Sequence, residues 1–439
     1  MYRSNHIDLQ TVNYESMNLL TRIYSVLLLL LVLGGCAGVP GPQVPDHVAP
    51  MMVEHELAER ELLNVSIKVF DPGELPADFD RTRGLSPEIR AAEARFVPVH
   101  LKYTLQRTGF WGAVRVVPDD DVGTDLLVRG RIVYSDGESL VLSVEAVDST
   151  NRIWLNKTYA ETARPTEHDK GDPGRSDTFQ DLFNTITNDL VLIRNRLSAD
   201  QVTGIRSVAE LRYASSMAPD AFAGYLQQGT DGRIVVTRLP PPGDPMMTRV
   251  RNVRSRDDML VDTINSYYDA YYQDLWEPYT DWRKFRSEEL STMRELEQQA
   301  LTRQLLGIAS IVGAIALGAA ADYDTRAQTS TLRDVMVMGG AAAIYSGVQK
   351  KEESRINREV IEELGTSFSS EAEPLVIEVD GETLRLTGSA EQQYARWRGI
   401  LRKIYARETG LLPEAAAEPD SRGQDHAEVP AVDQAAMHP

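Results

Sequence analysis

Cys36 is the residue whose type and position point most directly to a covalent chemistry. It is the one cysteine among 439 residues, so it cannot form a disulfide within the chain. It follows seven apolar residues, Leu27 to Leu33, and the pair Gly34-Gly35. That run is too short to span a bilayer, which needs about 20 residues. With Arg22 as a basic flank and the glycines as small residues before a cut, it predicts a signal peptide over residues 1–35, cleaved between Gly35 and Cys36.

The segment Leu33-Gly34-Gly35-Cys36 resembles the lipobox of bacterial lipoproteins. The resemblance implies that Cys36 becomes the acylated first residue of the mature chain, and several acyl chains together hold a protein firmly on a bilayer. It also implies retention in the outer membrane, with the body facing the periplasm, because Ala37 rather than an aspartate follows the cysteine. Asp8 and Glu15 are unusual before the apolar core of a signal, so Met17 is an alternative start. A cleaved signal followed by an incidental cysteine is the alternative interpretation.

Motifs for catalysis or cofactor binding are missing from the sequence. It contains no Gly-x-x-x-x-Gly-Lys-Ser/Thr, no His-Glu-x-x-His and no Gly-x-Ser-x-Gly. The histidines are scattered, and acidic pairs such as Asp119-Asp120 fall where solvated charge is the usual explanation. A net charge of -19 argues against nucleic acid or anionic lipid as a partner. We therefore expect a protein that is not an enzyme and that holds no cofactor and no metal.

The body of the protein is predicted to follow a Pro- and Gly-rich lipidated tether at 36–53. An α+β domain is expected at 54–197, with a first strand at Asn64 to Phe70 and a helix that Ser86 caps and Gly109 ends. Alternating apolar residues predict further strands at Ala113 to Val117, Asp125 to Tyr134, Leu140 to Val147 and Arg152 to Ala160. We expect a two-layer α/β sandwich in which helices cover one face of two or three antiparallel strands.

Part of this domain resembles a known periplasmic module. The order of a helix, Gly-Phe-Trp, a strand, and the stretches Thr124 to Ile132 and Asp148 to Trp154 carries the resemblance. It is similar to the domain shared by ABC-transporter auxiliary lipoproteins and the N-terminal domain of TolB. The resemblance implies a role in envelope assembly or transport through protein binding. Its motifs mark structure rather than chemistry, so no catalytic residue is carried over.

A row of aromatic residues is the next candidate for binding. A small mixed helical region is predicted at 198–256, and an aromatic helix opens the region 257–365. Tyr268, Tyr272 and Trp276 lie four residues apart on that helix and share one face. Such a row is a candidate platform for sugar rings, such as those of peptidoglycan, but it is more often a face packed into a core or against a partner. We favour packing.

The same region is predicted to contain a long antiparallel helical hairpin with two uncharged apolar segments near its tip, 305–321 and 335–348. Glycines in both arms would let the backbones approach closely, as small residues do where membrane helices meet: Gly307, Gly313, Gly318, Gly339, Gly340 and Gly347. The segments rise about 26 Å and about 21 Å, less than the hydrocarbon core of about 30 Å. We therefore favour a buried or oligomeric hairpin, with membrane insertion as the main alternative.

The chain is predicted to end in a β-hairpin and a helix at 366–410, followed by a disordered acidic tail at 411–439. Ser389 is expected to cap that last helix, whose buried face would comprise Trp397, Leu401, Ile404 and Tyr405.

Together these features predict a non-enzymatic outer-membrane lipoprotein that acts as a periplasmic scaffold or as an assembly or transport accessory. Its expected partners are the bilayer, through the acyl chains, and other envelope proteins, with a homo-oligomer formed through the hairpin as a further candidate. A pore-like transport component that inserts the hairpin and a protein that binds cell-wall glycan are the alternatives.

Overall fold

The structure is a computed structural model that describes residues 42–75, 86–163, 171–316, 357–366, 368, 375–379 and 382–409. The predicted signal peptide, Cys36 and the predicted tail at 411–439 lie outside these residues. So do the tip of the predicted hairpin and most of its second arm. All the described residues belong to one unit, which begins at Gly41.

Five strands form a mixed sheet in the order β2-β1-β3-β4-β5. β1 (Leu63–Lys68) lies between β2 (Trp111–Val117) and β3 (Leu126–Ser135) and runs parallel to both. β4 (Ser139–Asp148) and β5 (Ile153–Thr162) follow as antiparallel neighbours. The broad prediction of an α+β fold is confirmed. Three antiparallel strands, β3, β4 and β5, are present as expected. The parallel pairing of β1 with β2 and β3 was not expected, and the helix between β1 and β2 is the crossover that lets β1 and β2 run parallel.

The sheet has an apolar face and a charged face because its strands alternate. In β4, Leu140, Leu142, Val144 and Ala146 are at most 1% exposed, and they share a core with α2 (Pro87–Thr108) and α3 (Gln180–Arg194). On the opposite face, Arg129 of β3 donates to Glu145 of β4 at 3.1 Å. The helices therefore cover one face of the sheet, as a two-layer sandwich requires.

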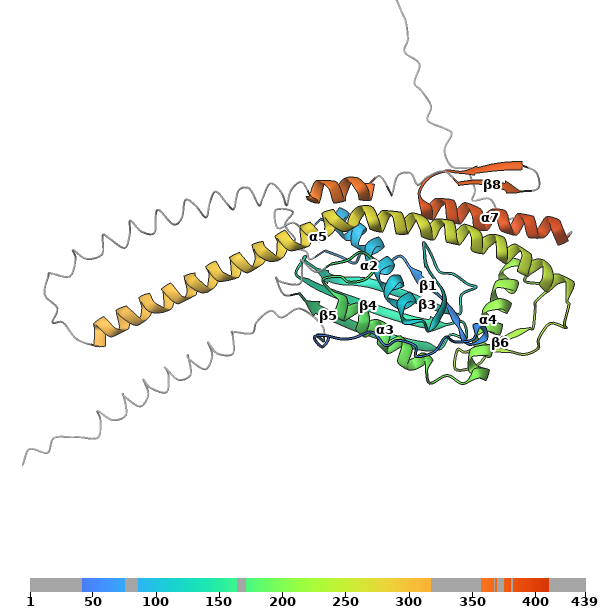
Figure 1. Ribbon diagram of the computed structural model, residues 1–439, viewed down its shortest axis with the longest axis horizontal. Helices are drawn as coiled ribbons and strands as arrows, with labels where there is room; N and C mark the ends of the chain where they lie inside the picture. The colour runs from blue at the N-terminus through green and yellow to red at the C-terminus, as the bar shows by residue number, and fades with distance from the viewer. Residues whose placement is uncertain are drawn as a thin grey trace, which may run out of the picture. The chain divides into compact units, whose positions relative to one another are not determined.

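α2 begins after Ser86 and ends at Gly109, the two residues that the sequence predicts as its limits. The hydroxyl of Ser86 accepts the N–H of Ile89, Pro87 is the first helical residue, and Gly109 ends the helix at φ +76°. Both sides of α2 are buried: Leu101 belongs to the core with the sheet, and Phe96 to the core with the later helices. α2 is therefore a middle layer between the sheet and α5 (Figure 1).

The small mixed helical region predicted at 198–256 contains one helix and a small hairpin before the next long helix begins. α4 (Ala199–Met217) begins with a capping box between Ser198 and Gln201. β6 (Leu226–Gln228) and β7 (Ile234–Val236) pair antiparallel. The hydroxyl of Ser149 donates to the carbonyl oxygen of Ile205. α4 therefore covers the end of the sheet at which β4 ends.

α5 is one continuous helix from Pro245 to Ala316, 72 residues long. Asp244 caps it by accepting the N–H of Met247 at 2.9 Å, and Pro245 takes the first helical position, which suits proline. The expected start near Asp257 was wrong. The sequence Asp244-Pro245 is an ordinary helix-start signal, but it directly follows a loop of prolines and glycine and reads as part of it.

Pro278 lies inside α5, and the helix continues through it. Proline removes one backbone hydrogen bond and crowds the preceding turn. The side chains around it compensate, since Leu275, Tyr279 and Trp282 are at most 1% exposed in the core. Packing on both sides of the proline therefore keeps the helix continuous.

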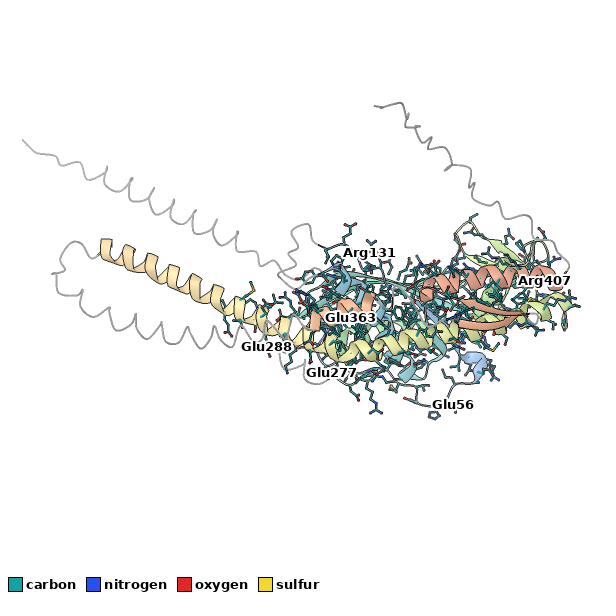
Figure 2. All side chains as sticks on the ribbon, turned by 90° about the horizontal axis from the view of Figure 1, so that it is seen from above. Glu56, Arg131, Glu277, Glu288, Glu363 and Arg407 are labelled. Carbon is teal, nitrogen blue, oxygen red and sulfur yellow. The ribbon has the colours of Figure 1, made fainter. Side chains whose placement is uncertain are left out.

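The chain returns to α5 in a helix at residues 357–366, where Glu363 is labelled in Figure 2. Ile361 is fully buried in the core that includes α5. Beyond this helix, the ring of Phe368 lies 5.4 Å from that of Tyr268 and 4.6 Å from that of Tyr271. The two ends of the predicted hairpin therefore meet on the body of the protein.

The C-terminal elements pack against the first half of α5. β8 (Leu375–Val379) and β9 (Glu382–Leu386) form the expected hairpin, and Ser389 caps α7 (Ala390–Thr409) by accepting the N–H of Gln392. The predicted buried face of α7 is confirmed, because its members are at most 3% exposed: Trp397, Leu401, Ile404 and Tyr405. Asp257 of α5 accepts from the indole N–H of Trp397 at 3.1 Å.

Candidate functional site

The predicted aromatic face lies inside the molecule. Tyr268 and Tyr272 are 0% exposed and Trp276 is 9% exposed. The ring of Phe96 on α2 covers them, at 4.6 Å from Tyr272 and 5.8 Å from Trp276. A sugar ring could reach this row only if α2 and α5 separated. The interpretation of these three residues as a glycan platform is therefore corrected, since their apolar surface is used to join two helices.

A chain of hydrogen bonds runs through the same helix interface and centres on His100 of α2. Its Nδ1 lies 2.8 Å from the hydroxyl of Tyr272, and its Nε2 lies 2.9 Å from Oε1 of Gln180. The Tyr272 hydroxyl also accepts the N–H of Gly174 at 3.1 Å. Because an amide oxygen can only accept, Nε2 carries the proton and Nδ1 accepts from Tyr272. Burial lowers the pKa of His100 below its ordinary value, so this imidazole is neutral.

Asp177 and Arg283 form an ion pair beside this chain of hydrogen bonds. The guanidinium of Arg283 donates to both carboxylate oxygens of Asp177, at 2.8 Å and 2.6 Å. Burial acts to raise the pKa of Asp177, but Arg283 outweighs it and lowers that pKa to about 2. Asp177 also accepts the N–H of Phe179, one residue before α3 begins. The pair therefore ties α5 to the segment that leads into α3.

Glu93 makes a second buried polar contact between α2 and α5. One oxygen of its carboxylate accepts from the hydroxyls of Tyr279, at 2.9 Å, and Ser135, at 2.5 Å. Glu93 is 1% exposed, and Asp177 and Arg283 are equally closed to solvent. A catalytic acid or base must reach a substrate. These groups do not reach the surface, so their arrangement fits a clamp between helices.

The turn between β3 and β4 holds α5 where that helix leaves the body. Glu138 of this turn, whose side chain is 7% exposed, pairs with Arg294 through two bonds of 2.8 Å and 2.5 Å. Gly137 has φ +92°, and a Cβ there would lie 2.7 Å from the side chain of Arg286. Only glycine suits this contact, because it combines a left-handed backbone with a close approach.

Next to this turn, the side chains of α5 change from buried to exposed. Thr292, Met293, Arg294 and Glu295 are all exposed, with Met293 at 46%. Figure 1 shows this half of α5 extending away from the sheet, in yellow and orange. Within the described ranges, no helix combines the length and the apolar character needed to cross a membrane.

Residues 42–53, predicted as part of a tether, are docked on the body, and we call them the strap. Pro42 and Val44 bond with Ala160 at the free edge of β5, through N–H to oxygen distances of 3.2 Å and 2.8 Å. At the other end, the N–H of Val53 donates to the carbonyl oxygen of Thr108 at the end of α2. The strap thus crosses from the edge of the sheet to α2.

α3 supplies the side chains that hold the middle of the strap. The carboxylate of Asp181 accepts the N–H groups of His47 and Val48 at 2.7 Å and 2.8 Å. Further along, the side-chain amide of Asn188 accepts from Met51 at 2.7 Å and donates to Ala49 at 2.9 Å. This docking was not predicted from the sequence. Its available signal was a row of short polar side chains on one face of α3, namely Asp181, Asn184 and Asn188.

The strap begins at the same end of the sheet at which the protruding part of α5 leaves the body. The carbonyl oxygen of Glu138, which pairs with Arg294, accepts the N–H of Ala163. Ala163 is three residues beyond Ala160, the residue that pairs with the first residues of the strap. Three residues of strand span about 10 Å. The start of the strap and the exit of α5 are therefore neighbours.

Only some of the remaining predicted site residues lie within the described parts of the chain. Gly35, Cys36, Gly318, Gly339, Gly340 and Gly347 lie outside the described residues. Gly307 and Gly313 lie within α5, which confirms helical backbone at both positions. Among the described residues, no group of three or more His, Cys, Asp or Glu side chains is arranged to hold a metal ion.

Comparison of the chain with protein-family models, curated proteins and solved structures gives no match. Function must therefore be argued from the chain's own residues.

Proposed function

We propose that the chain is a non-enzymatic lipoprotein of the outer membrane, held by acyl chains on Cys36, whose periplasmic body presents a helical arm to other envelope proteins. The observation that carries the proposal is the position of the strap beside the exit of α5. Resemblance to the lipobox and to the auxiliary-lipoprotein module supports the location and the general role.

The strap supports a short distance between membrane and body. Five residues, 37–41, separate Cys36 from Pro42, the first docked residue. Even fully extended, the chain from Cys36 to Pro42 spans about 20 Å. If the whole predicted tether up to residue 53 were free, the reach would be about 60 Å. Docking of the strap therefore fixes the end of the body that carries Ala160 close to the lipid surface.

The arm formed by the last part of α5 leaves from this same end. From Arg294 to Ala316 it has 22 further residues, a rise of about 33 Å. The arm is therefore longer than the distance of about 20 Å that the chain from Cys36 to Pro42 can span. It is well placed to meet partners at the membrane surface, either another envelope protein or a second copy of the chain.

The buried polar groups support a scaffold rather than an enzyme. The pair Asp177–Arg283 and the contacts of Glu93 fix α5 on α2 and on the segment before α3. A rigid base would hold the arm at one angle to the body. Such a base suits a protein whose task is to present a surface.

A second candidate function is membrane insertion of the hairpin as part of a transport component. One observation favours it: the start of the strap and the exit of α5 share one end of the body, so an anchor at Cys36 would hold the arm near the bilayer. The two functions differ in whether the arm alone can hold the protein on a membrane.

Membrane fractionation of the full chain separates these functions. The natural chain is expected in the outer-membrane fraction. A Cys36→Ala variant exported with a signal peptide of the non-lipoprotein type is expected in the soluble periplasmic fraction. Retention of that variant in alkali-washed membranes would instead support insertion of the hairpin. A natural chain found in the soluble fraction would contradict the lipid anchor on Cys36.

Site-specific cross-linking tests the arm as the docking surface. A photo-reactive residue replaces Met293, on the arm, and in a matched control it replaces Met259, which is 62% exposed on the part of α5 that packs on the body. We expect cross-links to an envelope protein or to a second copy from position 293 and not from position 259. Equal cross-linking from both positions would contradict a role for the arm.

A further inference from the structure

A groove lies between α4 and β7, at the end of the sheet away from the start of the strap at Pro42 and Val44. Its volume is about 280 Å³. The turn between β4 and β5 contributes Asp148, Thr150 and Arg152 to its lining. β4 runs ten residues from Ser139, beside Glu138, to Asp148, which is about 33 Å. The groove is therefore remote from the proposed membrane-facing end.

The walls of the groove are mainly apolar, with Gln201 and Arg233 as their polar members, and Arg233 pairs with Asp231 at 3.9 Å. α4 and the residues before it contribute Leu197, Ile205 and Val208, and β7 contributes Ile234 and Val236. Val235 also lines the groove and is 52% exposed. Gly204 leaves the helix wall open, because a Cβ at this position would meet no atom within 4 Å. The result is a slot that removes apolar surface from water when it is filled.

The side chain of Arg152 brings a positive charge to the slot. In the part of the chain that the structure describes, the guanidinium of Arg152 has no acidic or carbonyl partner, although the residue is half-buried. The one carboxylate in the groove, that of Asp148, is occupied by its own turn. It accepts from Thr150 at 2.9 Å and 2.5 Å, from the backbone of Arg152 at 3.1 Å and from the indole of Trp154 at 2.8 Å. Arg152 is therefore left to pair with an external anion.

The edge of β7 argues against a peptide in this slot. The N–H of Ile234, on the groove side of β7, already donates to the carbonyl oxygen of Thr150 at 2.9 Å. A bound peptide would bring its own N–H and C=O groups against apolar walls, where each unpaired group is costly. A hydrocarbon chain has no such groups, and its burial is favourable along its whole length.

We propose that the groove binds a single-chain fatty carboxylate, with the hydrocarbon between α4 and β7 and the carboxylate on Arg152. The volume of about 280 Å³ lies just below the usual range of ligand pockets, about 300 to about 1,000 Å³, so it suits one chain rather than two. A guanidinium can bind a carboxylate through two parallel hydrogen bonds. The proposal is independent of whether Cys36 is acylated and of what the arm binds.

Calorimetric titration with dodecanoate tests the proposal. The protein is the full mature chain with Cys36→Ala, so that neither acyl chains nor detergent compete, and the ligand stays below its micellar concentration. We expect one dodecanoate per chain. Gly204→Leu fills the slot and should abolish binding, while its match in α7, Gly399→Leu, also enters open space and should bind normally.

Binding of the ligand carboxylate by Arg152 is tested with the variant Arg152→Gln and with a neutral ligand. This variant should bind dodecanoate about tenfold more weakly and dodecanol unchanged, since one charge-assisted contact is lost. Arg175→Gln, at a side chain that is 79% exposed and does not line the slot, is the matched control. The proposal is overturned if the parent chain binds no dodecanoate, if Gly204→Leu binds as well as the parent, or if an apolar peptide binds the slot and dodecanoate does not.

Discussion

Asp177 and Arg283, 106 residues apart in the chain, make a two-bonded ion pair in which neither side chain is more than 1% exposed. Removing two charges from water costs several kcal/mol for each ion, which a pair repays only with good geometry and full hydrogen bonding. Here both carboxylate oxygens are used, and the backbone of Phe179 adds a further bond. The pair fixes where α5 crosses the body, and so fixes the base of the arm.

Asp177→Asn should destabilise the protein strongly. The change leaves the Arg283 charge buried without its partner, which typically costs about 3–5 kcal/mol. Urea denaturation followed by circular dichroism measures the free energy of unfolding. The matched control is Asp172→Asn, which breaks an exposed pair with Arg175 and should cost less than about 1 kcal/mol. A similar small loss for both variants would show that the buried pair is not a clamp.

The stability of the protein should fall in mild acid because of His100. Its pKa is lowered in the folded state by burial, so the unfolded chain binds a proton more readily. The contribution is complete above the ordinary pKa of 6.5 and is lost as the pH falls from there toward the folded value. His100→Gln should flatten the dependence of the unfolding free energy on pH in this window. His55→Gln, at an exposed position, should leave it as it is, and a slope that persists in His100→Gln would assign it to another group.

Release of the strap should be visible by hydrogen exchange. The double variant Asp181→Ala and Asn188→Ala removes the side-chain partners of His47, Val48, Ala49 and Met51. Each bond contributes about 0.5–1.5 kcal/mol, so amides of the strap should exchange at least about tenfold faster. Asn195→Ala, at the far end of α3, is the control. Unchanged protection of the strap would mean that other contacts hold it.

Trp276→Ala should change stability and not glycan binding. The residue packs on Phe96 and His100, and truncation of a buried tryptophan typically costs about 3–5 kcal/mol. Sedimentation with purified peptidoglycan should be the same before and after the change when both proteins are folded. Binding that is lost while the unfolding free energy stays constant would restore Trp276 as a surface residue.

Local signals in the sequence were sufficient for much of the fold. Ser86, Pro87 and Gly109 fix the limits of α2 through short-range hydrogen bonds and backbone conformation, which the sequence shows directly. The spacing of Trp397, Leu401 and Ile404 likewise predicts the buried face of α7. Such features depend on residues within a few positions of one another.

Features that depend on contacts between residues far apart in the chain could not be predicted from such local signals. The parallel pairing of β1 with β2 and β3 depends on how α2 crosses over, and nothing local marks it. The continuity of α5 at Pro278 depends on packing against α2. The strap has the composition of a free linker, yet side chains 133 to 139 residues away hold it. Tertiary partners decided each of these outcomes.

Mass spectrometry of the N-terminal peptide of the mature protein, purified from its native envelope, shows directly whether Cys36 is the lipid anchor. We expect the mature chain to begin at Cys36 and this residue to carry acyl chains. A mature chain whose Cys36 has a free thiol, or one that retains residues 1–35, would rule out the proposed anchor.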